Sequence, residues 1–203
     1  MVVSDDTIWG RKRNRMKLQT INSVDGYDLR WRWMDSPLGP ILLRSHGAKA
    51  TGVFLQDQQY FPDRSPSRQS STSEAGVPSV LLQLEAELNE YFSGNLQQFT
   101  TEFGLVGTAF QCNVWRQLQW IPFGQISTYG QIASRLGKDN ASRAVGAAIG
   151  KNPLSIVLPC HRVIGKSGAL TGYAGGLERK RWLLSFERGS SENSHFQQSL
   201  AFA

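Results

Sequence analysis

Two hydrophobic periodicities divide this chain, and the change between them constrains its fold more than any other feature. Between residues 29 and 55 lie three short strand-like stretches separated by turns, and the first of them alternates apolar and polar residues as a half-buried β-strand does. After Gly107, apolar residues recur at the spacing of helices. The change predicts an α+β protein: a small N-terminal α/β domain with an antiparallel sheet, and a C-terminal, mostly helical domain.

Composition sets the expected boundaries of these domains. We expect a basic, flexible extension over residues 1–27 and the α/β domain over 28–105. The helical domain is expected over 106–188 and a flexible tail over 189–203.

The N-terminal domain is expected to contain one helix and a long loop besides its strands. Residues 57–78 are rich in Ser, Gln, Pro and Asp, which predicts a flexible surface loop. Leucines at helical spacing then follow, with Ser79 as the expected N-cap and Gly94 just past the helix end. Residues 96–103 return to a strand pattern.

The C-terminal domain begins with three short helices. The first has one apolar face and is stopped by Pro122. The second opens at Thr128 with Gln131 three residues later, a capping box, and ends at Gly137. A short polar connection leads to the third helix over 141–149, so the last two helices form a helix-turn-helix candidate.

The third of these helices has almost no bulky side chains. Its small residues are Ala141, Ala144, Gly146, Ala147 and Ala148. Such a surface could approach DNA closely, or it could pack closely against the protein itself. Arg143, with Lys138 and Lys151 on either side of the helix, favours DNA.

Charge and cysteine content exclude several classes of protein. The formal net charge of +6 and the pI of about 9.6 favour a polyanionic partner. No apolar run approaches the roughly 18 residues of a membrane span. Two cysteines without a secretory signal do not form a disulfide framework, and paired zinc-ligand spacing is absent. A reducing compartment, the cytoplasm, is therefore expected.

The segment Pro159-Cys160-His161-Arg162-Val163 carries the strongest chemical signal. It follows the apolar run 154–158, which predicts a buried strand that the proline ends. Cys160 would be a thiol at the rim of the core, and positive neighbours stabilise the nucleophilic thiolate. The alternative is an inert buried cysteine, because free cysteines are among the most buried residues.

This segment resembles the active-site signature of the O6-alkylguanine-DNA alkyltransferases, also called methylated-DNA–protein-cysteine methyltransferases. Similar motifs run continuously over residues 108–188, with weaker ones at 36–40 and 91–94. They include Phe110-Gln111, Thr128-Tyr129-Gly130, Ser142-Arg143-Ala144-Val145-Gly146, Asn152-Pro153, Gly172-Tyr173-Ala174-Gly175-Gly176 and Trp182-Leu183-Leu184.

The resemblance implies a fold and a reaction. The N-terminal domain would be ribonuclease H-like and the C-terminal domain a winged helix-turn-helix carrying the cysteine. The protein would flip O6-alkylguanine, and also O4-alkylthymine, out of double-stranded DNA and move the alkyl group irreversibly to Cys160. Each molecule would act once, as a monomer without cofactor or metal, in the cytoplasm or, in a eukaryote, the nucleus.

The resemblance also implies residue roles. A relay from Glu187 through His161 and a water would activate Cys160, Tyr129 would donate a proton to the base, and Asn152 would be a hinge. Arg143 would replace the flipped base in the stack. Further DNA contacts would be Thr128, Tyr129, Ser142, Ala144, Lys151 and Arg162, and the substrate pocket would be lined by Ile149, Tyr173, Ala174 and Gly175.

Three other functions compete with this one. A non-catalytic winged-helix sensor of alkyl lesions is disfavoured because related sensors replace the cysteine, which is present here. A cysteine hydrolase using Cys160, His161 and Glu187 is disfavoured because adjacent residues of a strand point to opposite faces, which is poor for contact between the thiol and the imidazole. A plain winged-helix DNA binder would leave the segment 159–163 unexplained.

Overall fold

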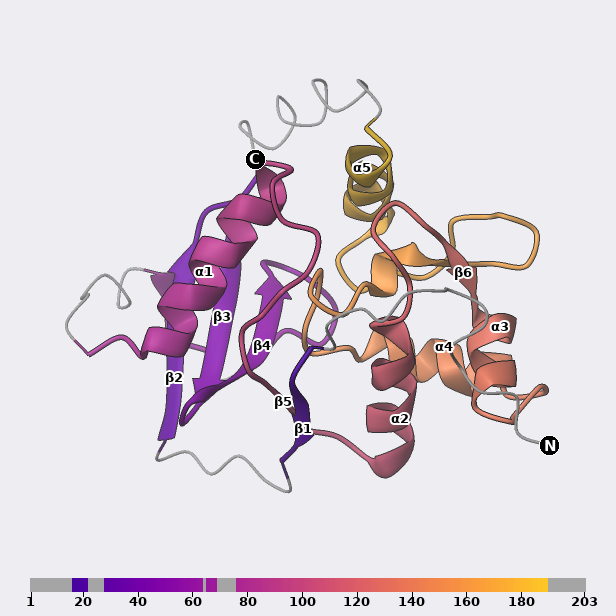
Figure 1. Ribbon diagram of the computed structural model, residues 1–203, viewed down its shortest axis with the longest axis horizontal. Coiled ribbons are helices and arrows are strands. Elements are labelled where there is room, and N and C mark those ends of the chain that lie inside the picture. Colours follow the sequence, from indigo (N-terminus) through magenta and orange to yellow (C-terminus); the bar gives the residue numbers. More distant parts are fainter. Residues whose placement is uncertain (1–15, 22–27, 64, 69–75, 190–203) are drawn as a thin grey trace.

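A computed structural model describes residues 16–21, 28–63, 65–68 and 76–189 (Figure 1). The extension expected over 1–27 and the tail expected over 189–203 therefore lie mostly outside the described residues. The protein is an α+β molecule with an N-terminal sheet domain and a C-terminal helical domain.

The N-terminal domain is a five-stranded sheet with one helix across a face. The strands are β1 (Leu18–Thr20), β2 (Leu29–Met34), β3 (Ile41–His46), β4 (Lys49–Leu55) and β5 (Phe103–Leu105), in the order β1-β5-β4-β3-β2. Strands β2, β3 and β4 pair antiparallel, as predicted for these three stretches. Strands β1 and β5 pair parallel, so the sheet as a whole is mixed. Helix α1 (Ser79–Phe92) packs its leucines on this sheet (Figure 1).

Two strand predictions were wrong in detail. Residues 18–20 were expected in a flexible extension, yet they form β1 against β5. This strand has only three residues, too few to show a period. A strand was expected over 96–103, but only Phe103 is part of β5. The backbone amides of Thr100 and Thr101 donate to the carboxylate of Glu87 and not to a neighbouring strand.

The ends of α1 and the loop before it also differ from expectation. Ser79 is the first helical residue, and Pro78 holds the N-cap position without a side-chain hydrogen bond. Gly94 follows the helix end with a φ of 81°, as predicted. Part of the loop expected to be flexible is packed, since Gln58 is buried and the Phe61 ring stacks on Trp33.

The C-terminal domain gathers beside the edge of the sheet where β1 and β5 lie (Figure 1). Its elements are α2 (Ala109–Leu118), β6 (Ser127–Thr128), α3 (Tyr129–Arg135), α4 (Ser142–Gly150), the 3-10 helix η4 (Cys160–Arg162), β7 (Val163–Ile164) and α5 (Leu177–Glu187). The predicted capping box of Thr128 and Gln131 is present at α3. Helices α3 and α4 form the predicted helix-turn-helix, and α4 packs on α2 as well.

The apolar run 154–158 is buried but is not a strand. Because β5 pairs with β4 only at Ala50, the edge of β4 beyond it is open, and Leu154 forms a single parallel bridge to Val53. The chain then turns, with Ile156 at a φ of 72°. The prediction of burial is confirmed, and the prediction of a strand is wrong. The bridge fixes the segment before Cys160 to the N-terminal sheet.

Candidate active site and DNA interface

Cys160 is the first residue of η4 and is 5% exposed. Its Sγ lies 3.2 Å from Nδ2 of Asn152, which donates to it. Burial raises the pKa of the thiol, while the Asn152 hydrogen bond and the positive charge of Lys180 act in the opposite direction. The group therefore rests as a thiol at neutral pH, and a nucleophilic reaction requires a base to remove its proton.

Asn152 links the end of α4 to Cys160. It is buried two residues beyond the last residue of the helix, and its Nδ2 also donates to the carbonyl oxygen of Leu158 at 2.8 Å. Its Oδ1 accepts from the amide of Leu154 at 3.0 Å. One side chain therefore ties the helix-turn-helix to the segment that carries the thiol.

His161 is fully buried beside Glu187. Its Nε2 lies 2.9 Å from Oε1 of Glu187, and Nδ1 bonds to no group in the part of the chain that the structure describes. Burial lowers the pKa of His161, opposed by the Glu187 carboxylate. A neutral imidazole next to a carboxylate carries its hydrogen on Nε2, so Nδ1 holds the lone pair. His161 is thus arranged as a base whose free acceptor is Nδ1.

Glu187, the last residue of α5, is a buried carboxylate that several hydrogen-bond donors keep ionised. Burial opposes ionisation, but His161 and Arg162 outweigh it and keep the pKa of the carboxyl well below its usual range. Oε1 accepts from Tyr91 Oη at 2.7 Å, His161 Nε2 and Arg162 Nη2, and Oε2 accepts from Arg162 Nε and the Gly124 amide. Of these donors, Tyr91, Arg162 and Gly124 were not predicted from the sequence.

The structure places Arg162, which was expected at the DNA, inside the protein. Its guanidinium is buried, with Nε and Nη2 on the two oxygens of Glu187 at 2.8 and 2.7 Å. Nη1 donates to the carbonyl oxygen of Ile121 at 2.6 Å. The 3-10 turn directs residues 160–162 inward, where an extended strand would have sent alternate side chains outward.

Lys180 is a site residue that the sequence analysis missed. This fully buried lysine of α5 donates from Nζ to the carbonyl oxygens of Val163, Thr171 and Gly172. Burial lowers its pKa to about 8, opposed by Cys160. It lies on the same helix face as Leu183, Leu184 and Glu187, so a lysine on an apolar helical face was the available signal.

The loop after β7 contains three of the residues expected to line the substrate pocket, Tyr173, Ala174 and Gly175. Tyr129 Oη donates to the carbonyl oxygen of Thr171 at 3.0 Å, and Ala174 accepts at its carbonyl from the Gln59 amide. Gly175 is buried, and a Cβ there would lie 2.6 Å from Leu55 of the N-terminal sheet and 2.7 Å from the Tyr173 ring. Its lack of a side chain therefore serves packing between the domains, a role that the sequence analysis did not assign.

Helix α4 divides into a buried and an exposed face. Val145, Ala148 and Ile149 are buried against the core, so the expected pocket residue Ile149 is on the inner face. Arg143, Ala144 and Ala147 are exposed. Of the small residues, Ala148 packs within the protein, while Ala144 and Ala147 leave a low surface around Arg143.

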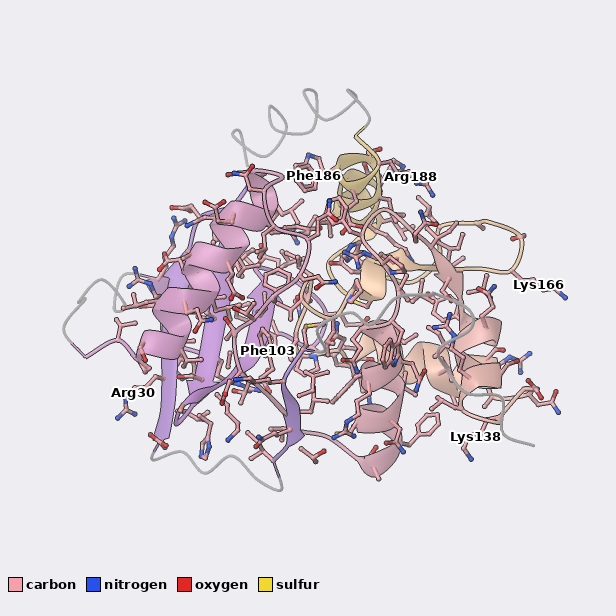
Figure 2. The ribbon with its side chains drawn as sticks, viewed as in Figure 1. Arg30, Phe103, Lys138, Lys166, Phe186 and Arg188 are labelled. Atoms are coloured by element: carbon pink, nitrogen blue, oxygen red, sulfur yellow. The ribbon has the colours of Figure 1, made fainter. Side chains whose placement is uncertain are left out.

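The other residues expected at the DNA are partly exposed. Ser142 and Thr128 are half-buried, and the Thr128 hydroxyl accepts from the Gln131 amide as the cap of α3. Lys151 is exposed, with its Nζ 5.6 Å from the centre of the Tyr60 ring. Figure 2 shows Lys138 and Lys166 projecting outward from the C-terminal domain, on the side away from the sheet. The helix-turn-helix side of the molecule therefore has a basic rim.

The described residues contain neither a membrane span nor a metal-binding cluster. Within residues 16–21, 28–63, 65–68 and 76–189, no helix is long and apolar enough to cross a bilayer. Over the same ranges, no three His, Cys, Asp or Glu side chains gather as a metal would require.

Comparison with protein families finds two matches that together span most of the chain. Residues 29–105 match the ribonuclease-like domain of 6-O-methylguanine DNA methyltransferase. Residues 109–189 match the DNA binding domain of 6-O-methylguanine DNA methyltransferase.

Individual relatives agree with these matches. A methylated-DNA–protein-cysteine methyltransferase of Mycobacterium tuberculosis is 46% identical over 160 residues, which are 79% of this chain and 93% of the relative. One from Salmonella typhimurium is 57% identical over 105 residues, 51% of this chain and 61% of that protein. The crystal structure of Mycobacterium tuberculosis OGT in complex with DNA superposes with a TM-score of 0.69 at 40% identity, covering 82% of this chain and 98% of that one.

Proposed function

Because the chain belongs to the 6-O-methylguanine DNA methyltransferase family, we propose that Cys160 is the alkyl acceptor in a DNA repair reaction. The protein is a DNA-binding enzyme that transfers an alkyl group from damaged DNA to a cysteine. The observation that carries the residue assignment is the position of Cys160, whose thiol is held by Asn152 next to the paired His161 and Glu187.

The reaction is a displacement at the alkyl carbon. The Sγ of Cys160 forms a bond to that carbon as the bond from carbon to guanine O6 breaks. The proton of the thiol leaves toward Nδ1 of His161 through a water, and guanine gains one proton, so the charges balance. Tyr129 is our candidate to donate that proton, since its hydroxyl lies against Thr171 of the pocket loop.

The acceptor is consumed in this reaction. The product at Cys160 is a thioether, which thiol–disulfide exchange cannot reverse. Each molecule therefore repairs one lesion. Alkylguanine is the proposed substrate class, and O4-alkylthymine is the second, because both carry the alkyl group on an exocyclic oxygen of a base.

Access to the alkyl group requires the base to leave the duplex. Cys160 is nearly buried, so it cannot reach into a base stack. The exposed Arg143 on the low surface of α4 is suited to enter the minor groove and fill the gap that the base leaves. We propose that the protein acts as a monomer on the chromosome, in the cytoplasm or, in a eukaryote, the nucleus.

The competing functions receive less support. The presence of a thiol with a neighbouring base favours transfer over a sensor of alkyl lesions. A hydrolase would need the imidazole to contact the thiol, whereas Nδ1 of His161 bonds to no group among the described residues and the hydrogen-bond partner of Sγ is Asn152.

Mass spectrometry tests the proposal. After incubation with duplex DNA containing one O6-methylguanine, we expect one added methyl group, on the peptide with Cys160, and no further turnover. Cys112 is a matched control because it is also a buried free thiol. Cys112→Ser should keep transfer and Cys160→Ser should lose it. Methylation at another residue, or repeated turnover, would reject Cys160 as the consumed acceptor.

A further inference from the structure

Tyr91 brings the N-terminal domain into direct contact with the proposed proton relay. The residue lies in the last turn of α1 and is completely buried. Its Oη donates to Oε1 of Glu187 at 2.7 Å, across 96 residues of sequence. The carboxylate that orients His161 is therefore completed by a side chain from the other domain.

The hydroxyl binds the same carboxylate oxygen that faces the imidazole. Oε1 of Glu187 accepts from Tyr91 Oη, His161 Nε2 and Arg162 Nη2. Donors that share one oxygen divide its electron density, so each weakens the hydrogen bonds of the others. Burial, and then the charge of Glu187, raise the pKa of Tyr91 well above its ordinary value, which keeps this hydroxyl protonated as a donor.

Aromatic packing from both domains holds the Tyr91 ring. Phe92 and Phe99 contact it from the N-terminal domain at centroid distances of 5.3 and 5.9 Å. Phe123 and Phe186 contact it from the C-terminal domain at 6.0 and 5.6 Å. A ring enclosed on these sides has little freedom to turn, so the hydroxyl stays directed at the carboxylate.

We propose that Tyr91 is a positioning residue for alkyl transfer, which holds Oε1 of Glu187 in place and limits how strongly this oxygen attracts the proton of His161. The proposal rests on the function proposed above. It gives the N-terminal domain a part in setting the base strength of His161.

A test of Tyr91 must distinguish its effect on His161 from the effects of the other groups nearby. The charged or titratable side chains that act on it are Glu187 and Lys180 of α5 and Arg162 of η4. Cys160 precedes His161 in the chain. The Tyr91 hydroxyl bonds to Glu187, which in turn bonds to His161. A change at Tyr91 should therefore alter His161 through the carboxylate alone.

The experiment compares Tyr91→Phe with the wild type. Loss of one donor leaves Oε1 a stronger acceptor, so the pKa of His161 should rise by about one unit, the size expected for a hydrogen bond to a charged group. Two readouts follow this change: the ¹⁵N chemical shifts of His161 against pH, and the pH dependence of Cys160 alkylation by free O6-benzylguanine. The acid limb of the rate profile should move to higher pH by the same amount.

Leu81→Ala is the control for lost packing, since Leu81 is buried at the opposite end of α1 from Tyr91 and the variant keeps the hydroxyl and the rings around it. It should lower the Tm and leave both pH readouts unchanged. An unchanged His161 titration in Tyr91→Phe, or the same shift in Leu81→Ala, would overturn the proposal.

A second substitution covers the case in which Tyr91→Phe does not fold. Incorporating 3-fluorotyrosine at position 91 keeps the ring and the hydroxyl but makes the hydroxyl a stronger donor. The pKa of His161 should then fall, and an unchanged value would overturn the proposal. The ¹⁵N titration needs no alkyl transfer, so a wild type that fails to react would reject the proposed function and still leave the role of Tyr91 open to measurement.

Discussion

Replacing Arg162 tests whether its guanidinium neutralises Glu187 inside the protein or contacts DNA. In Arg162→Met the methionine keeps most of the apolar stem and removes the guanidinium. If the guanidinium contacted DNA, the variant would be stable and bind DNA weakly. If it neutralises Glu187 inside the protein, the variant should lose stability first.

The magnitude follows from the contacts. The variant removes the two hydrogen bonds to Glu187, at 2.8 and 2.7 Å, and one to the carbonyl oxygen of Ile121. The carboxylate keeps Tyr91, His161 and the Gly124 amide as donors. Removing one partner of a buried ion pair costs about 3–5 kcal/mol. For a protein of this size we expect the Tm to fall by about 6–20 °C.

The assay measures urea unfolding and, at a temperature where the variant is folded, its affinity for duplex DNA. Arg143→Met and Lys151→Met are matched controls, because both side chains are exposed on the helix-turn-helix side. They should change stability by no more than about 0.5 kcal/mol and weaken DNA binding. The reasoning is refuted if Arg162→Met unfolds like the wild type and loses DNA affinity like Arg143→Met.

Three further predictions concern the same site. Arg143→Ala should slow repair of duplex DNA by at least about tenfold and leave reaction with free O6-benzylguanine unchanged, since only the duplex requires base flipping; equal losses in the two rate measurements would contradict this. Lys180→Met should slow alkylation of Cys160 by about tenfold near neutral pH, because a positive charge that opposes the raised thiol pKa is lost and the carbonyl oxygens of Val163, Thr171 and Gly172 each lose one donor; a rate equal to the wild type would show that this charge has no effect. The pKa of Glu187 in the folded state is depressed, so the contribution of this carboxylate to stability is complete above its ordinary pKa of 4.5 and is lost as the pH falls below that value. Urea unfolding between pH 3 and 6 should therefore show a weaker pH dependence in Glu187→Gln than in the wild type. Parallel curves of unfolding free energy against pH would contradict the assignment.

Local patterns in the sequence were sufficient where the determining interactions are local. The capping box of Thr128 and Gln131 and the turn at Gly94 involve residues within a few positions of one another, and both are present. The three strand-like stretches separated by short turns likewise predicted the antiparallel pairing of β2, β3 and β4, because short turns leave adjacent strands few other arrangements.

Local sequence patterns gave the wrong secondary structure where a strand distant in the sequence determines the pairing. The apolar run 154–158 has the composition of a strand, yet the edge of β4 offers it only one bridge before the chain turns. Strand β1 exists because β5 provides a parallel partner 85 positions away in register, Leu18 with Phe103. Neither outcome is encoded in the segment itself.

For the chemistry, the sequence by itself determined which reactive groups are present and in what order: a thiol, an imidazole and a guanidinium in succession, with a carboxylate 25 residues beyond Arg162. The tertiary structure decided what each does. The 3-10 turn directs Arg162 inward to Glu187, and the packing of α1 against α5 adds Tyr91 to the same carboxylate. The physical reason is that a buried charge must be neutralised by whichever donors the fold brings within reach, and those donors come from both domains.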